Sequence, residues 1–241
     1  MRIDILTLFP GMFEGVLEES MIKRARKKGK VDIRVYNLRD WADDKHGKVD
    51  DKPFGGGPGM VIKPQPLFDA VEDLKTRSSR VILMTPQGKR LDQPLARNLS
   101  KHKHIIIVCG HYEGIDERFR NKLVTDEISL GDFVLTGGEI PAMALVDCVV
   151  RLVPGVVGDK DSLEFESFAA GLLEYPQYTR PADFRGLKVP AVLLSGDHNK
   201  IDEWRRKIAI KRTRSRRPDM YKKIKILRQQ DKEKKQWTSA R

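Results

Sequence analysis

Short apolar runs rich in Val and Ile alternate with amphipathic stretches along the first 150 residues. The apolar runs predict strands at residues 3–9, 31–38, 80–85 and 104–109. Between and after them, apolar residues three or four positions apart predict helices at 12–28, 66–74, around Leu91–Leu99 and from 139 to about 152. The run IIIVC has no polar alternation, which is typical of a strand buried on both faces. The pattern therefore predicts an α/β domain with a parallel sheet.

The pattern changes after this part of the chain. Residues 154–166, PGVVGDKDSLEFE, have no clear period and predict a flexible linker. Further on, HNKIDEWRRKIAIKR places Ile201, Trp204 and Ile208 at helical spacing. We therefore expect a first domain at 1–158, an interdomain linker at 159–170 and a small all-helical domain at 171–241 that ends in a basic tail.

Charge is concentrated at the C-terminal end. The chain carries a net charge of +12, and residues 201–241 hold sixteen Lys and Arg against five Asp and Glu. This distribution indicates a polyanionic partner, although a solvated basic tail gives the same composition. Met220, Ile224 and Leu227 lie at helical spacing, so we expect part of this region to fold. Nucleic acid is favoured over a membrane surface, because the apolar face suits a protein core.

Composition also bears on location and cofactor class. No apolar run approaches the roughly 20 residues that a membrane helix needs, and MRIDILTLFP lacks the features of a signal peptide. Cys109 and Cys148 each lie in an apolar run, which predicts neither a disulfide framework nor a metal cluster. We expect a cytoplasmic protein without a membrane partner and without a resident metal site.

Three glycine-bearing stretches carry the candidate chemistry: FGGGPGM (54–60), CGHYEGIDERF (109–119) and LGDFVLTGGE (130–139). Each lies in a loop or near the end of a predicted strand, where open α/β sheets bind ligands. None matches a Walker or a Rossmann loop. Taken singly, each is a turn; together they predict a pocket for a flat, adenosine-like ligand. In the third stretch, a strand-like run at 133–135 meets Gly137 and Gly138, where glycine permits positive φ or close approach of a ligand.

Two charged positions leave alternatives open. Arg151 interrupts the apolar segment DCVVRLVPG, where it either caps a helix, forms an ion pair or faces a ligand. Glu166 is one of several linker acids, whose default role is a solvated loop charge.

Long motifs, in order from residue 1 to about 218, closely resemble the bacterial tRNA (guanine-N1)-methyltransferases, the TrmD type of the SPOUT class. They are VDDKPFGGGPGM, TPQGKRLDQ, IIIVCGHYEGIDER, SLGDFVLTGGEIPAM, RLVPGVVG, GLLEYPQYTRP and VPAVLLSGDH. The resemblance implies a SPOUT-type parallel sheet with a C-terminal trefoil knot at roughly 80–153, a feature that composition cannot predict.

The family implies S-adenosylmethionine bound in the knot and an obligate homodimer that acts on tRNA. The matching donor-binding positions are Thr85, Pro86, Gly110, Tyr112, Glu113, Gly114, Ser129, Leu130, Gly131, Phe133, Leu135, Gly137, Gly138 and Pro141. The resemblance also implies Mg²⁺ as a possible cofactor, because the family favours this cation.

The implied product is N1-methylguanine at tRNA position 37, just 3′ of the anticodon. Guanine N1 must lose its proton to a general base, and the charge that builds on O6 needs a cation. By resemblance Glu166 is the base, where the family usually has aspartate, and Arg151 is the cation. Gly59 and Glu174 match substrate positions, and His111 replaces a commoner arginine.

Two other functions remain open on the sequence. A non-catalytic RNA- or ribosome-binding protein with a degenerate knot would carry the same basic tail. A related SPOUT enzyme could act on another RNA. The intact glycine loops with Arg151 and Glu166 favour an enzyme, and GGGPGM with GLLEYPQYTRP favours the tRNA substrate.

Overall fold

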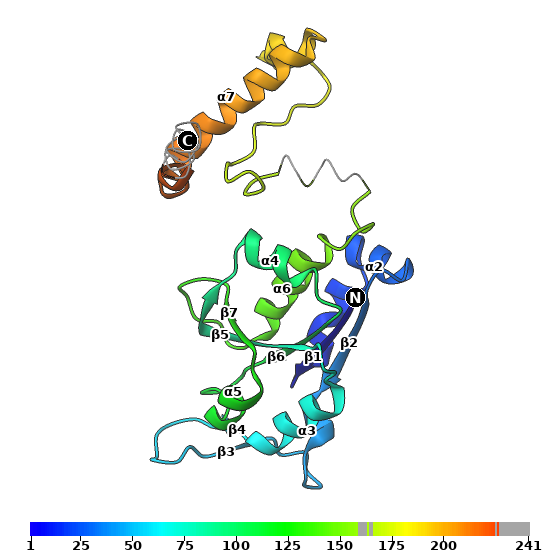
Figure 1. Ribbon diagram of the computed structural model, residues 1–241, viewed down its shortest axis with the longest axis vertical. Coiled ribbons are helices and arrows are strands. Elements are labelled where there is room, and N and C mark those ends of the chain that lie inside the picture. Colours follow the sequence, from blue (N-terminus) through cyan, green and yellow to red (C-terminus); the bar gives the residue numbers. More distant parts are fainter. Residues whose placement is uncertain (159–162, 164–165, 225, 227–241) are drawn as a thin grey trace, which may run out of the picture. The chain divides into compact units, whose positions relative to one another are not determined.

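The computed structural model describes residues 1–158, 163, 166–224 and 226. The chain divides into two compact units, Met1–Gly158 and Asp159–Arg241 (Figure 1). Of the linker expected at 159–170, residues 163 and 166–170 are described and the other six are not.

The first unit alternates strands and helices. Its elements are β1 (Arg2–Thr7), η1 (Pro10–Phe13), α1 (Glu14–Leu17), α2 (Ser20–Lys27), β2 (Asp32–Asn37), η2 (Leu38–Trp41), β3 (Asp50–Asp51), β4 (Val61–Ile62), α3 (Pro64–Leu74), β5 (Arg80–Arg90), α4 (Gln93–Leu99), β6 (His104–Cys109), α5 (Glu117–Leu123), β7 (Asp126–Ser129) and α6 (Glu139–Val150).

Five strands form one sheet in the order β2-β1-β6-β5-β7, and every pair in it is parallel. The predicted parallel α/β sheet is thus confirmed, and β1, β2, β5 and β6 are the four predicted strands. The sequence pattern missed β7, a four-residue strand that begins with two acids. It also missed the extension of β5 to Arg90, because that segment is largely polar and exposed.

Helices cover both faces of the sheet (Figure 1). One buried cluster packs α2, α4 and α6 against residues such as Ile5 and Ile107. The other packs α3 and α5 against Leu6 and Val108. Neighbouring residues of one strand therefore enter opposite cores, which explains why β6 is apolar throughout.

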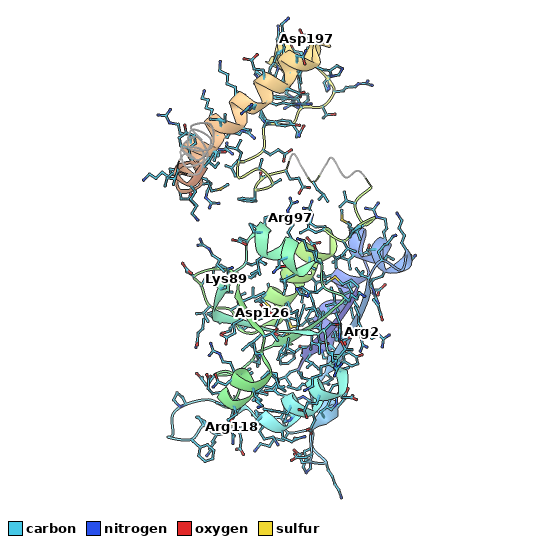
Figure 2. The ribbon with its side chains drawn as sticks, in the orientation of Figure 1. Arg2, Lys89, Arg97, Arg118, Asp126 and Asp197 are labelled. Atoms are coloured by element: carbon cyan, nitrogen blue, oxygen red, sulfur yellow. The ribbon has the colours of Figure 1, made fainter. Side chains whose placement is uncertain are left out.

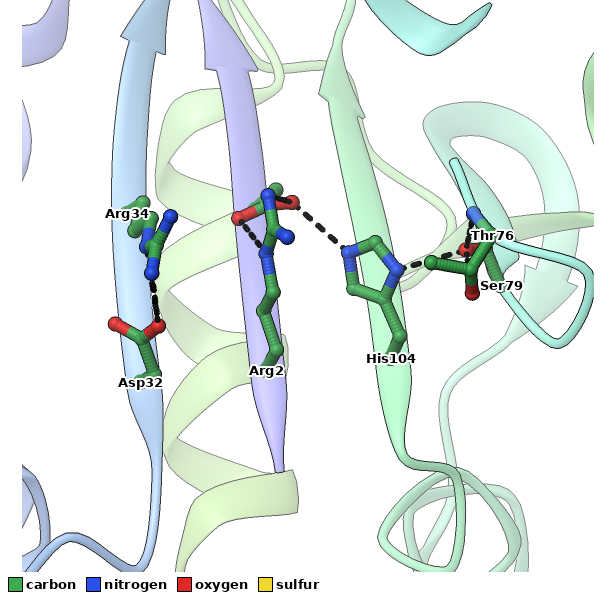
Figure 3. Close-up of polar contacts among 7 residues, drawn as sticks. Arg2, Asp32, Arg34, Thr76, Ser79 and His104 are labelled. Carbon is green, nitrogen blue, oxygen red and sulfur yellow. Dashed lines mark hydrogen bonds and ion pairs between the residues drawn. The ribbon is translucent and has the colours of Figure 1, made fainter. Parts of the chain in front are cut away.

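A buried polar network joins the amino-terminal ends of adjacent strands (Figure 3). Asp4 on β1 is fully buried; it accepts a hydrogen bond from Arg2 Nε at 3.0 Å and lies 2.8 Å from Nε2 of His104 on β6. Ser79 Oγ, just before β5, lies 2.7 Å from the other imidazole nitrogen and accepts a hydrogen bond from the Thr76 amide. These contacts satisfy the buried carboxylate, as burial requires.

Two predicted elements differ in the structure. The helix expected at 12–28 is broken into η1, α1 and α2, and Ser20 has a positive φ of 50° at the break. The strand-like run at 133–135 is an irregular loop, and Val134 in it is 82% exposed. Among the described residues no strand pairs with this run, and β propensity alone does not form a strand.

The second unit contains one long helix, α7 (His198–Arg216), together with η4 (Ala191–Leu194), β8 (Asp183–Phe184) and β9 (Leu187–Lys188). Asp197, labelled in Figure 2, caps α7 by accepting a hydrogen bond from the Lys200 amide at 3.1 Å. The antiparallel β8–β9 hairpin means that the expectation of an all-helical unit is wrong in this detail. Met220 and Ile224 are helical as expected, and Leu227 lies outside the described residues. Over the described chain, no helix is both long and apolar enough to cross a membrane.

Candidate active site

Two loops at the carboxyl-terminal edge of the sheet, which follow β6 and β7, enclose a cavity of about 520 Å³ together with residues 83–87 of β5. Parallel strands bring their carboxyl ends to one edge. Every donor-binding residue expected from the sequence lines this cavity except Gly131. Gly131 instead lies against the Phe133 ring, since a Cβ on Gly131 would be 2.8 Å from Phe133 Cε1.

Gly138 joins the loop after β7 to α6. Its φ is −81°, so the positive φ that the sequence allowed is not present. A Cβ on Gly138 would lie 2.7 Å from Cys109 Cα and 2.8 Å from the Gly110 amide nitrogen. The Gly138 amide donates a hydrogen bond to the Gly110 carbonyl at 2.8 Å. Glycine is therefore needed for the start of α6 to pack against the end of β6.

His111 is a cavity residue that the sequence analysis noted only as a departure from the family. Its ring lies edge-on between Phe9 and Tyr112, with centroids 4.9 and 4.8 Å away. Its Nδ1 is buried and has no hydrogen-bond partner among the described residues. A Cβ on Gly137 would contact this nitrogen and a carboxylate oxygen of Glu139. Two polar groups thus converge beneath the loop.

Glu139 is buried at the first turn of α6, where the helix dipole stabilises a carboxylate. It accepts a hydrogen bond from Thr7 Oγ1 at 2.8 Å, and that oxygen accepts one from the Phe9 amide. The carboxylate therefore links the ends of β1 and α6 below the cavity.

Helix α5 adds charged residues to the lining, namely Glu117 and Arg120. Arg120 donates to Glu127 at 2.6 Å and to the Gln87 side chain at 2.8 Å, and the Glu127 carboxylate raises the pKa of Arg120. Asp116 caps the helix through the Arg118 amide, and the Arg118 guanidinium lowers the pKa of Asp116. In the sequence, Asp116, Glu117 and Arg118 lie within the second glycine stretch and Arg120 directly follows it.

The glycine loop FGGGPGM is attached to the cavity wall. The Glu113 amide donates to the Met60 carbonyl, and the Ile62 amide donates to the Gly114 carbonyl, both at 3.0 Å. Gly59 has a φ of 79° and lies directly against the Glu113 side chain. The structure thus places a predicted substrate residue beside a predicted donor residue.

Arg151 lies at the other end of α6 and is its C-cap residue. Its amide donates to the Asp147 carbonyl at 3.2 Å, and the residue is half-buried. The backbone role expected as one alternative is therefore present.

Glu166 and Glu174 line one cavity of about 470 Å³ in the second unit. The segment that carries Glu174 is fixed to α7, because the Leu173 amide donates to Thr213 Oγ1 at 2.8 Å. The Glu174 amide donates to Ser167 Oγ at 3.0 Å. Because Ser167 directly follows Glu166, this hydrogen bond holds the two glutamates close together. Asp202 also lines this cavity, so three carboxylates there can accept protons from a bound base.

Neither cysteine is placed for nucleophilic catalysis. Burial raises the pKa of the Cys109 thiol well above its ordinary value, and burial also raises that of Cys148. Within the described residues, no group of three or more His, Cys, Asp or Glu side chains could hold a metal ion. Mg²⁺ therefore has no structural support.

The chain was compared with known proteins. The family model described as tRNA (Guanine-1)-methyltransferase TrmD matches residues 1–223. A tRNA (guanine-N(1)-)-methyltransferase of Geobacillus kaustophilus is 58% identical over 243 residues and covers 100% of both chains. Proteins with the same description from Bacillus subtilis and Dictyoglomus turgidum are 57% and 58% identical, covering 98% and 94% of this chain and 99% and 92% of their own.

Proposed function

The chain belongs to the tRNA (guanine-1)-methyltransferase TrmD family, and from this premise we propose that it methylates N1 of guanine 37 in tRNA, 3′ of the anticodon. The observation that carries the proposal is the convergence of two glycine-bearing loops, after β6 and β7, with residues 83–87 of β5 on one cavity at the carboxyl edge of the sheet. This edge is where open α/β sheets bind ligands.

Family membership implies S-adenosylmethionine as the methyl donor, and the lining of the cavity fits it. The Leu130, Leu135 and Pro141 side chains offer apolar contact to an adenine ring, and the glycine backbones offer hydrogen bonds. Glu113 and Glu117 place carboxylates beside a site that must accept a cationic sulfonium. When bound, the donor supplies an electrophilic methyl group.

We also propose that residues 80–153 form the trefoil knot of the SPOUT class. The support is the path of β5, which pairs with Ile128 of β7 at Met84 and again at Lys89. A Cβ on Gly88 would overlap the Glu127 and Ile128 backbone. The chain therefore passes β7 at a distance that only glycine permits.

Within this function Glu166 serves as the general base. Free glutamate has a pKa of about 4.3 and is ionised at neutral pH, so it can accept the N1 proton. Glutamate is a much weaker base than deprotonated guanine N1, so the proton leaves only as charge on the ring is stabilised. Arg151 is assigned to the developing charge on O6. Glu174 shares the cavity of Glu166 and is assigned to holding the guanine.

The functional enzyme is proposed to be a cytoplasmic homodimer. Neither Arg151 nor Glu166 is among the described residues that line the donor cavity. We therefore propose that these two residues complete the active site of the partner subunit. Gly59 is assigned to the tRNA, beside the donor residue Glu113.

Replacement of Glu166 tests the assignment of the base. Glu166→Gln keeps the size of the side chain and removes its basicity. We expect the single-turnover rate of N1-methylguanine formation to fall by roughly 10²–10⁴-fold, with donor and tRNA affinities almost unchanged. Glu166→Asp should retain much of the rate, since aspartate is the family's usual residue.

Glu164→Gln is the matched control, because it removes an acid two positions away in the same segment; Glu164 itself lies outside the described residues. If Glu166→Gln methylated tRNA at the wild-type rate and Glu174→Gln were inactive, the general base would be Glu174 and not Glu166. Wild-type protein that binds tRNA but forms no methylated nucleoside would support a non-catalytic RNA-binding function instead.

A further inference from the structure

A cavity of about 390 Å³ in the second unit is lined by none of the residues assigned to catalysis, and it shares Tyr175 and Arg205 with the cavity of Glu166 and Glu174. We propose that it binds one unpaired nucleotide of the RNA substrate, with the base against Tyr178 and the phosphate on Arg180. The inference rests on the proposed function only in taking RNA as the partner. It assigns a role to the motif YPQYTR, for which the methyl-transfer chemistry has no use.

The cavity is built by several elements of the second unit. Its walls are the extended segment 175–182, Val189 after β9, the η4 turn and the first turns of α7. The Val189 amide donates to the Ala182 carbonyl at 2.9 Å, which holds the segment against the end of the hairpin. The walls are thus positioned by folded elements rather than by a free loop.

The apolar part of the lining suits a planar base. Ile201 closes the cavity from α7 and is buried, while Leu193 and Leu194 face it from η4. Tyr178 is 49% exposed, so one part of its ring lies in the cavity and another meets solvent. Aromatic rings in such positions stack unpaired bases of any sequence.

The charged part of the lining is cationic. Arg180 and Arg205 line the cavity, and no acidic residue does. Arg205 is already engaged, since its guanidinium stacks 4.9 Å from the Tyr175 ring centroid and contacts Asp202 at 3.3 Å. Its Nε is buried and has no hydrogen-bond partner in the part of the chain that the structure describes.

Arg180 differs from Arg205 in this respect. Within the described residues, neither the Arg180 guanidinium nor the Tyr178 hydroxyl has a hydrogen bond, ion pair or ring contact. Both stand on the same short segment, two residues apart, at the mouth of one cavity. An exposed guanidinium beside an exposed aromatic ring matches the phosphate and the base of a single nucleotide.

RNA fits this arrangement better than an acidic peptide does. A peptide would use the arginine but not the flat apolar slot, whereas a nucleotide uses both. The net charge of +11 on residues 201–241 also favours a polyanion over a small anion. An unpaired loop nucleotide is the form of RNA whose base is free to enter a protein pocket.

The test measures binding of an anticodon stem-loop RNA that carries 2-aminopurine at each loop position in turn. We expect Tyr178→Ala to weaken binding by roughly 5- to 100-fold and to abolish the fluorescence change at one loop position. Tyr178→Phe should bind as wild type. Phe184→Ala is the matched control, because Phe184 is 55% exposed and lies under Arg185 in the same unit but outside the cavity.

Arg180→Gln provides a second variant that leaves the ring in place. It should lower the slope of log affinity against log salt by about 0.7, the value for one single-strand phosphate contact. Unchanged S-adenosylmethionine affinity and unchanged melting temperature show that each variant is folded.

Equal affinities of wild type and Tyr178→Ala, or equal losses in Tyr178→Ala and Phe184→Ala, would overturn the proposal. Failure of the proposed function looks different, because wild-type protein would then form no N1-methylguanine. Methylation by the wild type with an unaltered Tyr178→Ala would remove the nucleotide site alone.

Discussion

The two edges of the parallel sheet are built in opposite ways. At the amino-terminal edge, Asp4 is fully buried and paired with Arg2 and His104, whose ring also contacts Ser79. At the carboxyl-terminal edge, glycine loops surround a cavity, and the buried Nδ1 of His111 has no partner among the described residues. Polar groups whose hydrogen bonds are all made within the protein hold the strands together. A polar group beside a cavity that lacks a hydrogen-bond partner can bond to a ligand. The residues that stabilise the sheet and the residues that line the ligand cavity therefore lie at opposite ends of the strands.

The largest effect should follow from breaking the amino-terminal network. Asp4→Ala leaves His104 buried without its carboxylate, whereas Arg2, with a side chain 33% exposed, can turn to water. We therefore expect a loss near the lower end of the range for a broken buried pair, about 3 kcal/mol in the free energy of unfolding. Denaturant titration measures this loss. Calorimetry on the folded variant should give a wild-type S-adenosylmethionine affinity, and a large fall in affinity would contradict the separation of the two edges.

A smaller loss of stability with a larger loss of binding should follow from Gly138→Ala. The added Cβ meets the Cys109 and Gly110 backbone at 2.7–2.8 Å, which forces α6 away from the end of β6. Overpacking of this kind costs about 1–3 kcal/mol, and we expect donor affinity to fall at least about tenfold because the cavity wall moves.

Gly110→Ala is the control for overpacking in the Gly138 experiment, since its Cβ would meet only the Met84 carbonyl oxygen, at 3.7 Å. Its stability should match the wild type. Loss of stability in Gly110→Ala equal to that in Gly138→Ala would show that the contact at Gly138 is not the cause.

The smallest effect concerns Asp116, which caps α5 beside the cavity. Asp116→Ala should cost about 1 kcal/mol of stability, as for other N-caps. Because the Arg118 guanidinium lowers the pKa of Asp116, its contribution is present above the ordinary carboxyl pKa of 3.8 and is lost as pH falls through the lowered value. Thermal melts of both proteins from pH 6 down to pH 2 should therefore converge at the acid end. A gap that stays constant with pH would assign the loss to helix propensity rather than to the charge.

The sequence was sufficient to identify the α/β class, four of the five strands of the parallel sheet and the family. Buried strands such as β6 are apolar throughout, so local composition is sufficient to identify them. Family motifs located the three glycine stretches, since those loops depend on glycine at fixed positions. The sequence could not identify β7, whose four residues form a strand only because β5 pairs with them along one edge.

The contacts of individual side chains could be identified only from the tertiary structure. Gly138 and Gly137 are adjacent in the sequence, yet one faces the Cys109 backbone and the other faces His111 and Glu139. The polar stretch HKH at 102–104 predicts a surface position for His104, and this prediction is wrong, because His104 is buried against Asp4, a hundred residues earlier in the chain. Such pairings depend on strand order and register, which arise from packing between distant segments. Local propensity reports the conformation of a segment, and it carries no information about which segment lies beside it.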